Sequence, residues 1–283
     1  GFWADERVDG NIWKLNNPVF KTVYTFFKKK EKAFLSKADY VVSLTHNAEK
    51  IIHSWKEIEN QPIPIKVIPC CVDLELFNPS LINNEEIQRL KSELTIPEGV
   101  KVITYIGSIG TWYMLPEMLS FFKRWQLNNP DSIFLFVTND SPSVINNAVV
   151  EAGLSLSSIR IRFAARTEVP LYISLGDYSI FFIKPVFSKK ASSPTKQGEI
   201  MAMGKPVICN SEVGDTDYVV NSFNSGILLN KFEHAAYDNA IDELKNGKQF
   251  NASVIREGAL QFFSLEEGIN RYEAVYKSVL SEN

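Results

Sequence analysis

The chain has 283 residues, of which 45% are hydrophobic and 22% are charged. This length accommodates one large or two ordinary domains, and the composition is that of a folded protein rather than a disordered one. The formal net charge of −3 gives no electrostatic basis for binding nucleic acid. No apolar run approaches the ~20 residues that cross a bilayer, and no signal peptide is recognisable.

The chain contains three cysteines, Cys70, Cys71 and Cys209, and two of them are adjacent. An odd number in this arrangement resembles neither a disulfide framework nor a zinc site. The three histidines show no metal-binding spacing either. A reducing cytoplasm therefore fits the cysteine usage best, and peripheral contact with the inner face of a membrane is left open.

The first part of the chain alternates between helical and extended patterns. Residues Pro18–Lys37 predict a helix with one apolar face and one face rich in lysine. A basic amphipathic helix can lie on an anionic membrane, but a solvated face opposite a core stripe is the favoured interpretation. The elements expected next are a strand at Ala38–Leu44, a helix at Asn47–Lys56 and a strand at Ile65–Pro69.

After a charged helix at Glu85–Leu94, short apolar runs recur with helical patterns between them. This alternation predicts an α/β fold with a parallel, doubly wound sheet, whose strands are apolar throughout because helices cover both faces. Ligands of such sheets bind beyond the carboxyl ends of the strands. The expected strands are Lys101–Gly110, Ile133–Val137, Ile159–Phe163, Tyr178–Ile183, Pro206–Cys209 and Gly226–Leu229.

The segment S-S-P-T-K-Q-G-E-I-M-A-M-G, residues Ser192–Gly204, predicts a helix whose start can bind an anion. Ser193 is expected as the N-cap, Pro194 as the first helical residue and Gly204 as the left-handed end. The first backbone N–H groups of a helix, including that of Thr195, lack intrahelical partners and lie at the positive end of the helix dipole. A phosphate group is stabilised in that place.

Two side chains of this helix extend the prediction from a phosphate to a nucleotide. Lys196 adds a mobile cation on the first turn. Glu199, one turn further on, can accept hydrogen bonds from both hydroxyls of a vicinal diol such as ribose. The alternative is a well-capped helix of an α/β domain that binds nothing.

A glycine-containing turn follows the first strand of the predicted sheet, at Gly107-Ser108-Ile109-Gly110. Glycine allows the backbone to approach a ligand closely, and the turn can present N–H groups to a pyrophosphate. Its spacing is not G-x-G-x-x-G, so the dinucleotide fingerprint is absent. A purely structural turn remains the alternative.

The motif S-P-x-K-x-x-E-x-M-A-x-G-x-P-V-I resembles the donor-binding segment of retaining glycosyltransferases of the group 1, or family 4, type. C-C-V-D-L-E-L-F-N-P, residues Cys70–Pro79, is similar to their interdomain linker, and the opening G-F-W-x-D-E to a segment late in their N-terminal domain. The resemblance implies the two-domain GT-B fold and a nucleoside-diphosphate sugar as the donor.

The resemblance also assigns residues, and the chain departs from the family's pattern in several of them. Glu199 corresponds to the second glutamate of an E-x7-E pattern, which holds the donor ribose, whereas the first falls at Ala191. The carboxylate that usually contacts the transferred sugar is therefore missing. The family's G-G-x-P-E donor loop is reduced to Gly214 and Asp215, of which Asp215 is also a plausible helix N-cap.

Family members often carry a cation near the glycine turn, where this chain has Thr111, Trp112 and Tyr113. Lys196 is thus the main candidate to neutralise the diphosphate, with substitutes in a nearby basic loop and after the third strand. These substitutes are Arg166, Lys189 and Lys190.

The domain division implied by the resemblance has three parts. Residues 1–68 are expected to be the remnant of an N-terminal, acceptor-side α/β domain whose first half is absent. Residues 69–262 form the C-terminal domain that binds the nucleotide sugar, and residues 263–283 form a helix that crosses back. Apolar faces left uncovered around residues 1–65 favour dimerisation, and the chain alone is expected to bind a nucleotide without transferring sugar.

The predicted function is retaining transfer of a hexose-type sugar from a nucleoside diphosphate to a glycan or lipid-linked acceptor, without a cofactor. Metal independence is expected because no D-x-D carboxylate pair stands where a metal would bridge the phosphates. The catalytic roles fall on Lys196 and Glu199. The donor-binding residues are expected to be Gly107, Ser108, Gly110, Ser193, Thr195, Lys196, Glu199 and Gly214. A sugar-nucleotide epimerase and a non-catalytic sugar-nucleotide or polysaccharide-binding module are the alternatives.

Overall fold

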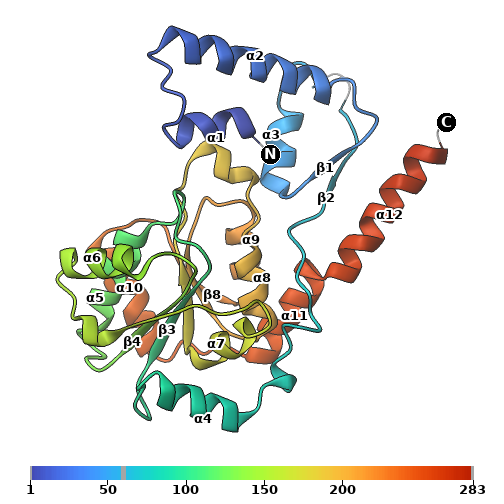
Figure 1. Cartoon of the computed structure of the whole chain (residues 1–283). Coiled ribbons are helices and arrows are strands. Elements are labelled where there is room, and N and C mark those ends of the chain that lie inside the picture. The colour runs from blue at the N-terminus through green and yellow to red at the C-terminus, as the bar shows by residue number, and fades with distance from the viewer. Residues whose placement is uncertain (1, 59–61, 282–283) are drawn as a thin grey trace.

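The computed structural model describes residues 2–58 and 62–281, and these form two parallel sheets of different size (Figure 1). The small sheet pairs β1 (Val41–Ser43) with β2 (Ile65–Val67). The large sheet has six strands in the order β5-β4-β3-β6-β7-β8, and every pairing within it is parallel. Its strands are β3 (Val102–Ile106), β4 (Ile133–Val137), β5 (Ile159–Arg162), β6 (Tyr178–Phe181), β7 (Val207–Asn210) and β8 (Gly226–Leu229).

Helices cover both faces of the large sheet. Helix α5 contacts α6 and α10 on one face, and α11 contacts α8 and α9 on the other (Figure 1). The helices after β2 are α4 (Asn84–Glu93), α5 (Leu115–Trp125), α6 (Pro142–Glu151), α7 (Val169–Leu175), α8 (Thr195–Ala202), α9 (Thr216–Ser222), α10 (His234–Lys245), α11 (Ala252–Phe263) and α12 (Leu265–Ser281). The predicted doubly wound α/β sheet is confirmed.

The strand order fixes where a ligand can bind. The chain builds outwards from β3 to β5, then returns to the centre with β6 and builds the other way to β8. All residues of β3 and β4 are buried, as their continuous apolar runs predict. The direction of winding reverses between β3 and β6, and in sheets of this kind the crevice beyond the carboxyl ends of those two strands is the binding position.

The C-terminal helix expected at residues 263–283 corresponds to α12, which a break at Ser264 separates from α11. Ser264 has an extended backbone and forms an isolated parallel bridge with Val72 of the linker. The N–H of Val72 donates to the carbonyl of Phe263 over 2.8 Å. Pairing with the linker therefore interrupts the helix, and the sequence pattern of the helix alone does not contain that information.

The N-terminal part of the chain contributes three helices, α1 (Trp3–Asp9), α2 (Pro18–Leu35) and α3 (His46–His53). Helix α3 packs on the small sheet, while α1 contacts α2 and η3 (Phe187–Ala191). Phe2, Ile52 and Ile58 are the centre of a second, smaller core that also includes Ala191 from the other part of the chain. The helix predicted at Pro18–Lys37 does not bury its expected core stripe: no residue of α2 is fully buried, and Phe27 and Phe34 are exposed.

Polar contacts hold α2 against α1. The carboxylate of Asp5 accepts hydrogen bonds from Tyr24 Oη over 2.8 Å and from Lys28 Nζ over 2.7 Å.

Along the described ranges of the chain, no helix is both long enough and apolar enough to cross a membrane.

Asp215 joins α3 to the large sheet. It occupies the N-cap position of α9, as predicted, but its side chain makes no capping bond there. Its carboxylate instead accepts from the backbone N–H of His46 over 2.7 Å, from His46 Nδ1 over 2.8 Å and from the N–H of Asn47 over 3.2 Å. Asp215 therefore binds the first N–H groups of α3, although the two lie far apart in the sequence.

Replacing Asp215 by Ala is expected to loosen α3 without unfolding the large sheet. Loss of a helix cap of this kind costs about 1–2 kcal/mol. Hydrogen exchange of the α3 amides should accelerate correspondingly. Asp217→Ala is the matched control, because the Asp217 carboxylate accepts from Glu212 and does not contact α3. Unchanged exchange in α3 of the Asp215 variant would contradict the assignment.

Candidate functional site

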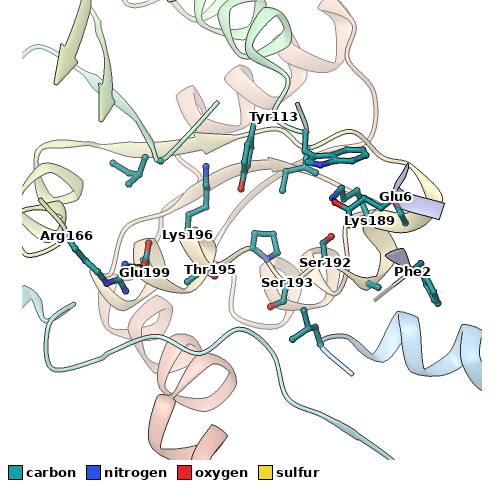
Figure 2. A pocket seen from close by; sticks show the side chains of 18 residues that line it. Phe2, Glu6, Tyr113, Arg166, Lys189, Ser192, Ser193, Thr195, Lys196 and Glu199 are labelled. Atoms are coloured by element: carbon teal, nitrogen blue, oxygen red, sulfur yellow. Dashed lines mark hydrogen bonds and ion pairs between the residues drawn. The ribbon is translucent and has the colours of Figure 1, made fainter. Parts of the chain in front are cut away.

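A pocket of about 580 Å³ opens at the crevice between β3 and β6 (Figure 2). Gly107 borders it directly after β3, and Ile183 borders it just beyond β6. The start of α8 forms one wall, and residues of α1 reach it from the N-terminal part of the chain. The pocket thus lies where the topology of the sheet predicts a ligand.

Helix α8 begins at Thr195, and the prediction that Ser193 caps it is wrong. Pro194 occupies the N-cap position and offers no side-chain acceptor. The hydroxyl of Ser193 accepts from the backbone N–H of Cys70 in the linker over 3.1 Å. Gly204 ends the segment with a φ of +66°, as predicted.

No hydrogen bond to the backbone N–H groups of Thr195 and Lys196 is present among the described residues. Both residues line the pocket, and they stand at the positive end of the helix. The start of α8 therefore leaves two donors for a ligand, as expected for a helix that binds an anion.

Lys196 is buried rather than mobile, with only 8% of its surface exposed. Its ammonium nitrogen lies 3.6 Å from the ring centre of Tyr113 and 4.2 Å from that of Tyr105, whose hydroxyl is 3.1 Å away. Burial lowers the pKa of Lys196 to about 7, against the opposing attraction of the Glu199 and Asp140 carboxylates. Lys196 therefore loses its proton at a much lower pH than an exposed lysine does.

Gly107 allows this arrangement. Its φ of +99° disfavours any side chain, and a Cβ atom there would lie 3.5 Å from Lys196 Nζ. Ser108 and Gly110, the other predicted residues of the turn, do not line the pocket. The Ser108 hydroxyl and the N–H of Ile109 bind the carboxylate of Asp140, and the Ile109 bond is the main cause that lowers the pKa of this acid.

Glu199 lies buried one turn into α8, on the same pocket wall as Lys196 (Figure 2). Its Oε1 accepts from Arg166 Nη1 over 2.8 Å. In the described part of the chain no protein donor reaches its Oε2. The Arg166 side chain is 60% exposed, so it can move aside and free Oε1 as well, which leaves both oxygens for a diol.

The cations considered as substitutes are engaged in different ways. Arg166 pairs with Glu199 and lies over the ring of Phe77 at 5.2 Å. Lys189 donates to Glu6 over 2.9 Å. Lys190 does not line the pocket, and its carbonyl accepts from Thr45 over 2.7 Å.

Gly214 lies outside the pocket and has a packing role. Its N–H donates to the carbonyl of Lys189 over 2.9 Å, and it has a φ of +48°. A Cβ atom at this position would lie 1.9 Å from the carbonyl oxygen of Ser192. Gly214 therefore allows its loop to pack against the segment that leads into α8. It does not line the pocket in which the sugar donor is expected.

Gly214→Ala is expected to lower the free energy of unfolding by about 2–4 kcal/mol, because backbone strain and overlap with Ser192 add. Gly247→Ala is the matched control, since Gly247 also has positive φ (+93°) but has no atom within 4 Å of an added Cβ. Chemical denaturation of both variants separates the strain from the overlap. Equal losses in the two variants would show that the overlap has no cost.

The sequence patterns did not assign Glu6 and Tyr113, which line the pocket, or Tyr105, which contacts Lys196 without lining the pocket. The sequence patterns treated Tyr113 only as a position that lacks the family's cation. An aromatic side chain after the first strand can, however, pack against a lysine. Glu6 belongs to the opening G-F-W-x-D-E motif, but nothing in the sequence indicates that it contacts Lys189, which is 183 positions further along the chain.

The chain also contains a D-x-D sequence at Asp215–Asp217. Its two carboxylates bind α3 and the N–H of Glu212 and do not line the pocket.

No family model matches the chain. It is 23% identical over 200 residues to the alpha-monoglucosyldiacylglycerol synthase of Acholeplasma laidlawii, covering 67% of this chain and 48% of the relative. It is 22% identical over 249 residues to the UDP-Gal:alpha-D-GlcNAc-diphosphoundecaprenol alpha-1,3-galactosyltransferase of Escherichia coli, covering 86% of this chain and 61% of the relative. The chain therefore spans about half the length of the first relative and about three fifths of the second.

Solved structures share the architecture. A sucrose-phosphate synthase from Thermosynechococcus elongatus superposes with a TM-score of 0.71 at 20% identity, over 89% of this chain and 61% of that one. The fold is that of the GT-B glycosyltransferases. HepE from Anabaena, in complex with UDP and glucose, superposes with a TM-score of 0.64 at 15% identity, over 88% and 64%. The GT-B fold and the resemblance to group 1 glycosyltransferases stated from the motifs are confirmed.

Proposed function

We propose that the pocket binds a nucleoside-diphosphate sugar and that the protein transfers its hexose-type sugar with retention of configuration. The observation that carries this proposal is the position of Lys196. It lies buried at the start of α8, one turn before Glu199 and beside two backbone N–H groups that no described residue of the chain binds. These groups suit a diphosphate followed by a ribose, in the crevice that the sheet topology selects.

The donor is arranged along α8. Glu199 accepts from the ribose hydroxyls, and the N–H groups of Thr195 and Lys196 bind the diphosphate together with the Lys196 ammonium. When the bond between the anomeric carbon and the diphosphate breaks, negative charge grows on the leaving oxygen. Donors fixed in a buried place stabilise that charge more in the transition state than in the ground state.

Metal independence belongs to the same proposal. Its support is that the pocket has its own cation and helix terminus for the diphosphate charge, while the Asp215 and Asp217 carboxylates are engaged elsewhere. The activity of a full-length protein that contains this chain, measured with excess chelator, is expected to equal its activity with added Mg²⁺. Loss of activity on chelation that Mg²⁺ restores would contradict this part.

The names of the relatives support the choice of donor and acceptor. One relative uses UDP-Gal and an undecaprenol-linked acceptor, and HepE has been solved with UDP and with UDP-glucose. We therefore favour a uridine-diphosphate sugar as the donor and a lipid-linked or glycan acceptor. The corresponding process is cell-envelope or polysaccharide synthesis. The proposed place of action is the cytoplasm, with the inner face of the membrane as the site of the acceptor.

Incubation with a panel of sugar nucleotides and acceptors, followed by mass spectrometry, tests the proposal. Transfer to an acceptor is the expected result for a protein of the relatives' full length that contains this chain, whereas the chain alone is expected to bind the sugar nucleotide without transferring it. The anomeric configuration of the product, read by NMR, tests retention. A sugar nucleotide whose sugar is epimerised would make the protein an epimerase. A sugar nucleotide that the full-length protein binds and returns unchanged with every acceptor would make it a binding module.

A further inference from the structure

The pocket extends beyond the groups assigned to the ribose and the diphosphate. Figure 2 shows Arg166 and Glu199 at one end, Lys196 and Thr195 in the middle, and Glu6 and Lys189 at the other end. A nucleoside-diphosphate sugar is a linear sequence of ribose, diphosphate and sugar. If the proposed function holds, the end that contains Glu6 and Lys189 is left for the sugar.

This end is polar and charged, but its two charges are paired. Glu6 Oε1 accepts from Lys189 Nζ over 2.9 Å, and the same ammonium lies 3.8 Å from the ring centre of Trp112. The Lys189 side chain is 9% exposed and that of Glu6 is 41% exposed. Within the described ranges, no donor of the protein binds the second oxygen of Glu6, which remains available to a ligand.

The backbone holds Glu6 in this place. Glu6 lies on α1, which packs against the 3-10 helix η3 (Phe187–Ala191). The carboxylate of Asp9, one turn along α1, accepts from the N–H of Ser188 over 2.9 Å. Ala191, at the end of η3, is buried beside Phe2 and supplies no polar group.

We propose that Glu6 recognises the transferred sugar, as an extension of the function proposed above. Its second carboxylate oxygen accepts from sugar hydroxyls, and Lys189 donates to a neighbouring sugar oxygen. Glu6 thereby supplies, from the other part of the chain, the carboxylate that is lacking at Ala191. Because the Glu6 and Lys189 charges cancel, the subsite fits a neutral hexose better than a uronate, which needs an unpaired cation.

Calorimetry with UDP and UDP-glucose tests the inference on the whole chain. Glu6→Gln keeps the shape and removes the charge. The variant should bind UDP within about twofold of the wild type, and the ratio of UDP-glucose to UDP affinity should fall about tenfold. Glu98→Gln, at an exposed position outside the pocket, is the matched control and should change neither affinity.

A second variant deals with the lysine that Glu6→Gln leaves unpaired. The double substitution Glu6→Gln and Lys189→Met removes both charges, so the buried ammonium no longer perturbs the docking of α1. This double variant should bind UDP with the wild-type affinity, and its ratio of UDP-glucose to UDP affinity should fall as it does in Glu6→Gln. In the wild type, UDP-glucose should bind more tightly than UDP-glucuronate, and the opposite order would overturn the choice of a neutral sugar.

The outcomes separate this inference from the proposed function. If UDP binds and the ratio stays constant in both variants, Glu6 does not contact the sugar and only this inference falls. If UDP and UDP-glucose weaken in parallel, Glu6 acts by holding the pocket together, and the inference falls as well. If the wild type binds neither UDP, GDP nor ADP, nor their glucose conjugates, the proposed function fails and this inference fails with it.

Discussion

Replacing Lys196 by Met is expected to weaken the binding of a nucleoside diphosphate about 10- to 150-fold, the loss expected for a hydrogen bond to a charged group. Met fills the space between Tyr105 and Tyr113 without the charge. The nucleoside should bind almost as before, because it has no phosphate. Calorimetry with UDP and uridine on both proteins measures this, and an unchanged ratio of the two affinities in the variant would contradict the role of Lys196.

The low pKa of Lys196 adds a dependence on pH to this result. Burial lowers it to about 7 in the free protein, and a bound diphosphate favours the charged form. Above pH 7, binding therefore requires the uptake of a proton, and the UDP affinity should fall by up to about tenfold per pH unit. The Met variant should lack this fall. A wild-type affinity that is constant from pH 7 to 9 would be inconsistent with the account.

The same lysine should influence the stability of the free protein with a definite sign. Its pKa is lower in the folded than in the unfolded state, so the cost of burying the charge is complete below pH 7. Between pH 7 and about 10.5 the unfolded chain binds a proton that the folded chain does not. The free energy of unfolding of the wild type, relative to Lys196→Met, should therefore rise across this range. A constant difference would contradict the burial of the ammonium.

Glu199→Gln should have the second large effect, and its pattern differs from that of Lys196. Gln retains the shape and an oxygen for Arg166 but removes the charge that strengthens hydrogen bonds from ribose. The expected loss is about 1.5–3 kcal/mol, or roughly 10- to 150-fold in affinity. UDP and uridine should lose affinity alike, because both contain the ribose.

A deoxynucleotide sharpens this measurement. Wild-type protein should bind 2′-deoxy-UDP more weakly than UDP, and the Glu199→Gln variant should distinguish the two much less. Glu98→Gln serves again as the exposed control. If the variant binds UDP as the wild type does, or still discriminates fully against the deoxynucleotide, then Glu199 does not hold the ribose.

The sequence predicts the large sheet well because buried parallel strands leave a strong local signal. Ile133–Val137 and Gly226–Leu229 have the predicted bounds, since each is a short apolar run between turn residues. Features that depend on contacts between residues distant in the sequence are not predictable from local patterns. The backbone N–H of Cys70 in the linker donates to the Ser193 hydroxyl, and pairing with Val72 separates α11 from α12 at Ser264.

The site was predictable to the extent that it lies on α8. Lys196 and Glu199 are marked by their spacing from the start of the helix, and both line the pocket. The burial of Lys196 was not predictable, because it depends on two tyrosines contributed by another segment. Glu6 is a stronger case, because only the docking of α1 on η3 brings it to Lys189.

A crystal structure of the chain with UDP tests the central claim most directly. We expect the diphosphate within hydrogen-bond distance of the Thr195 N–H and of Lys196 Nζ, with the ribose hydroxyls on Glu199 and the Glu6–Lys189 end open. A nucleotide bound outside this pocket, or one whose phosphates lie on Lys189 while the base contacts Lys196, would contradict it.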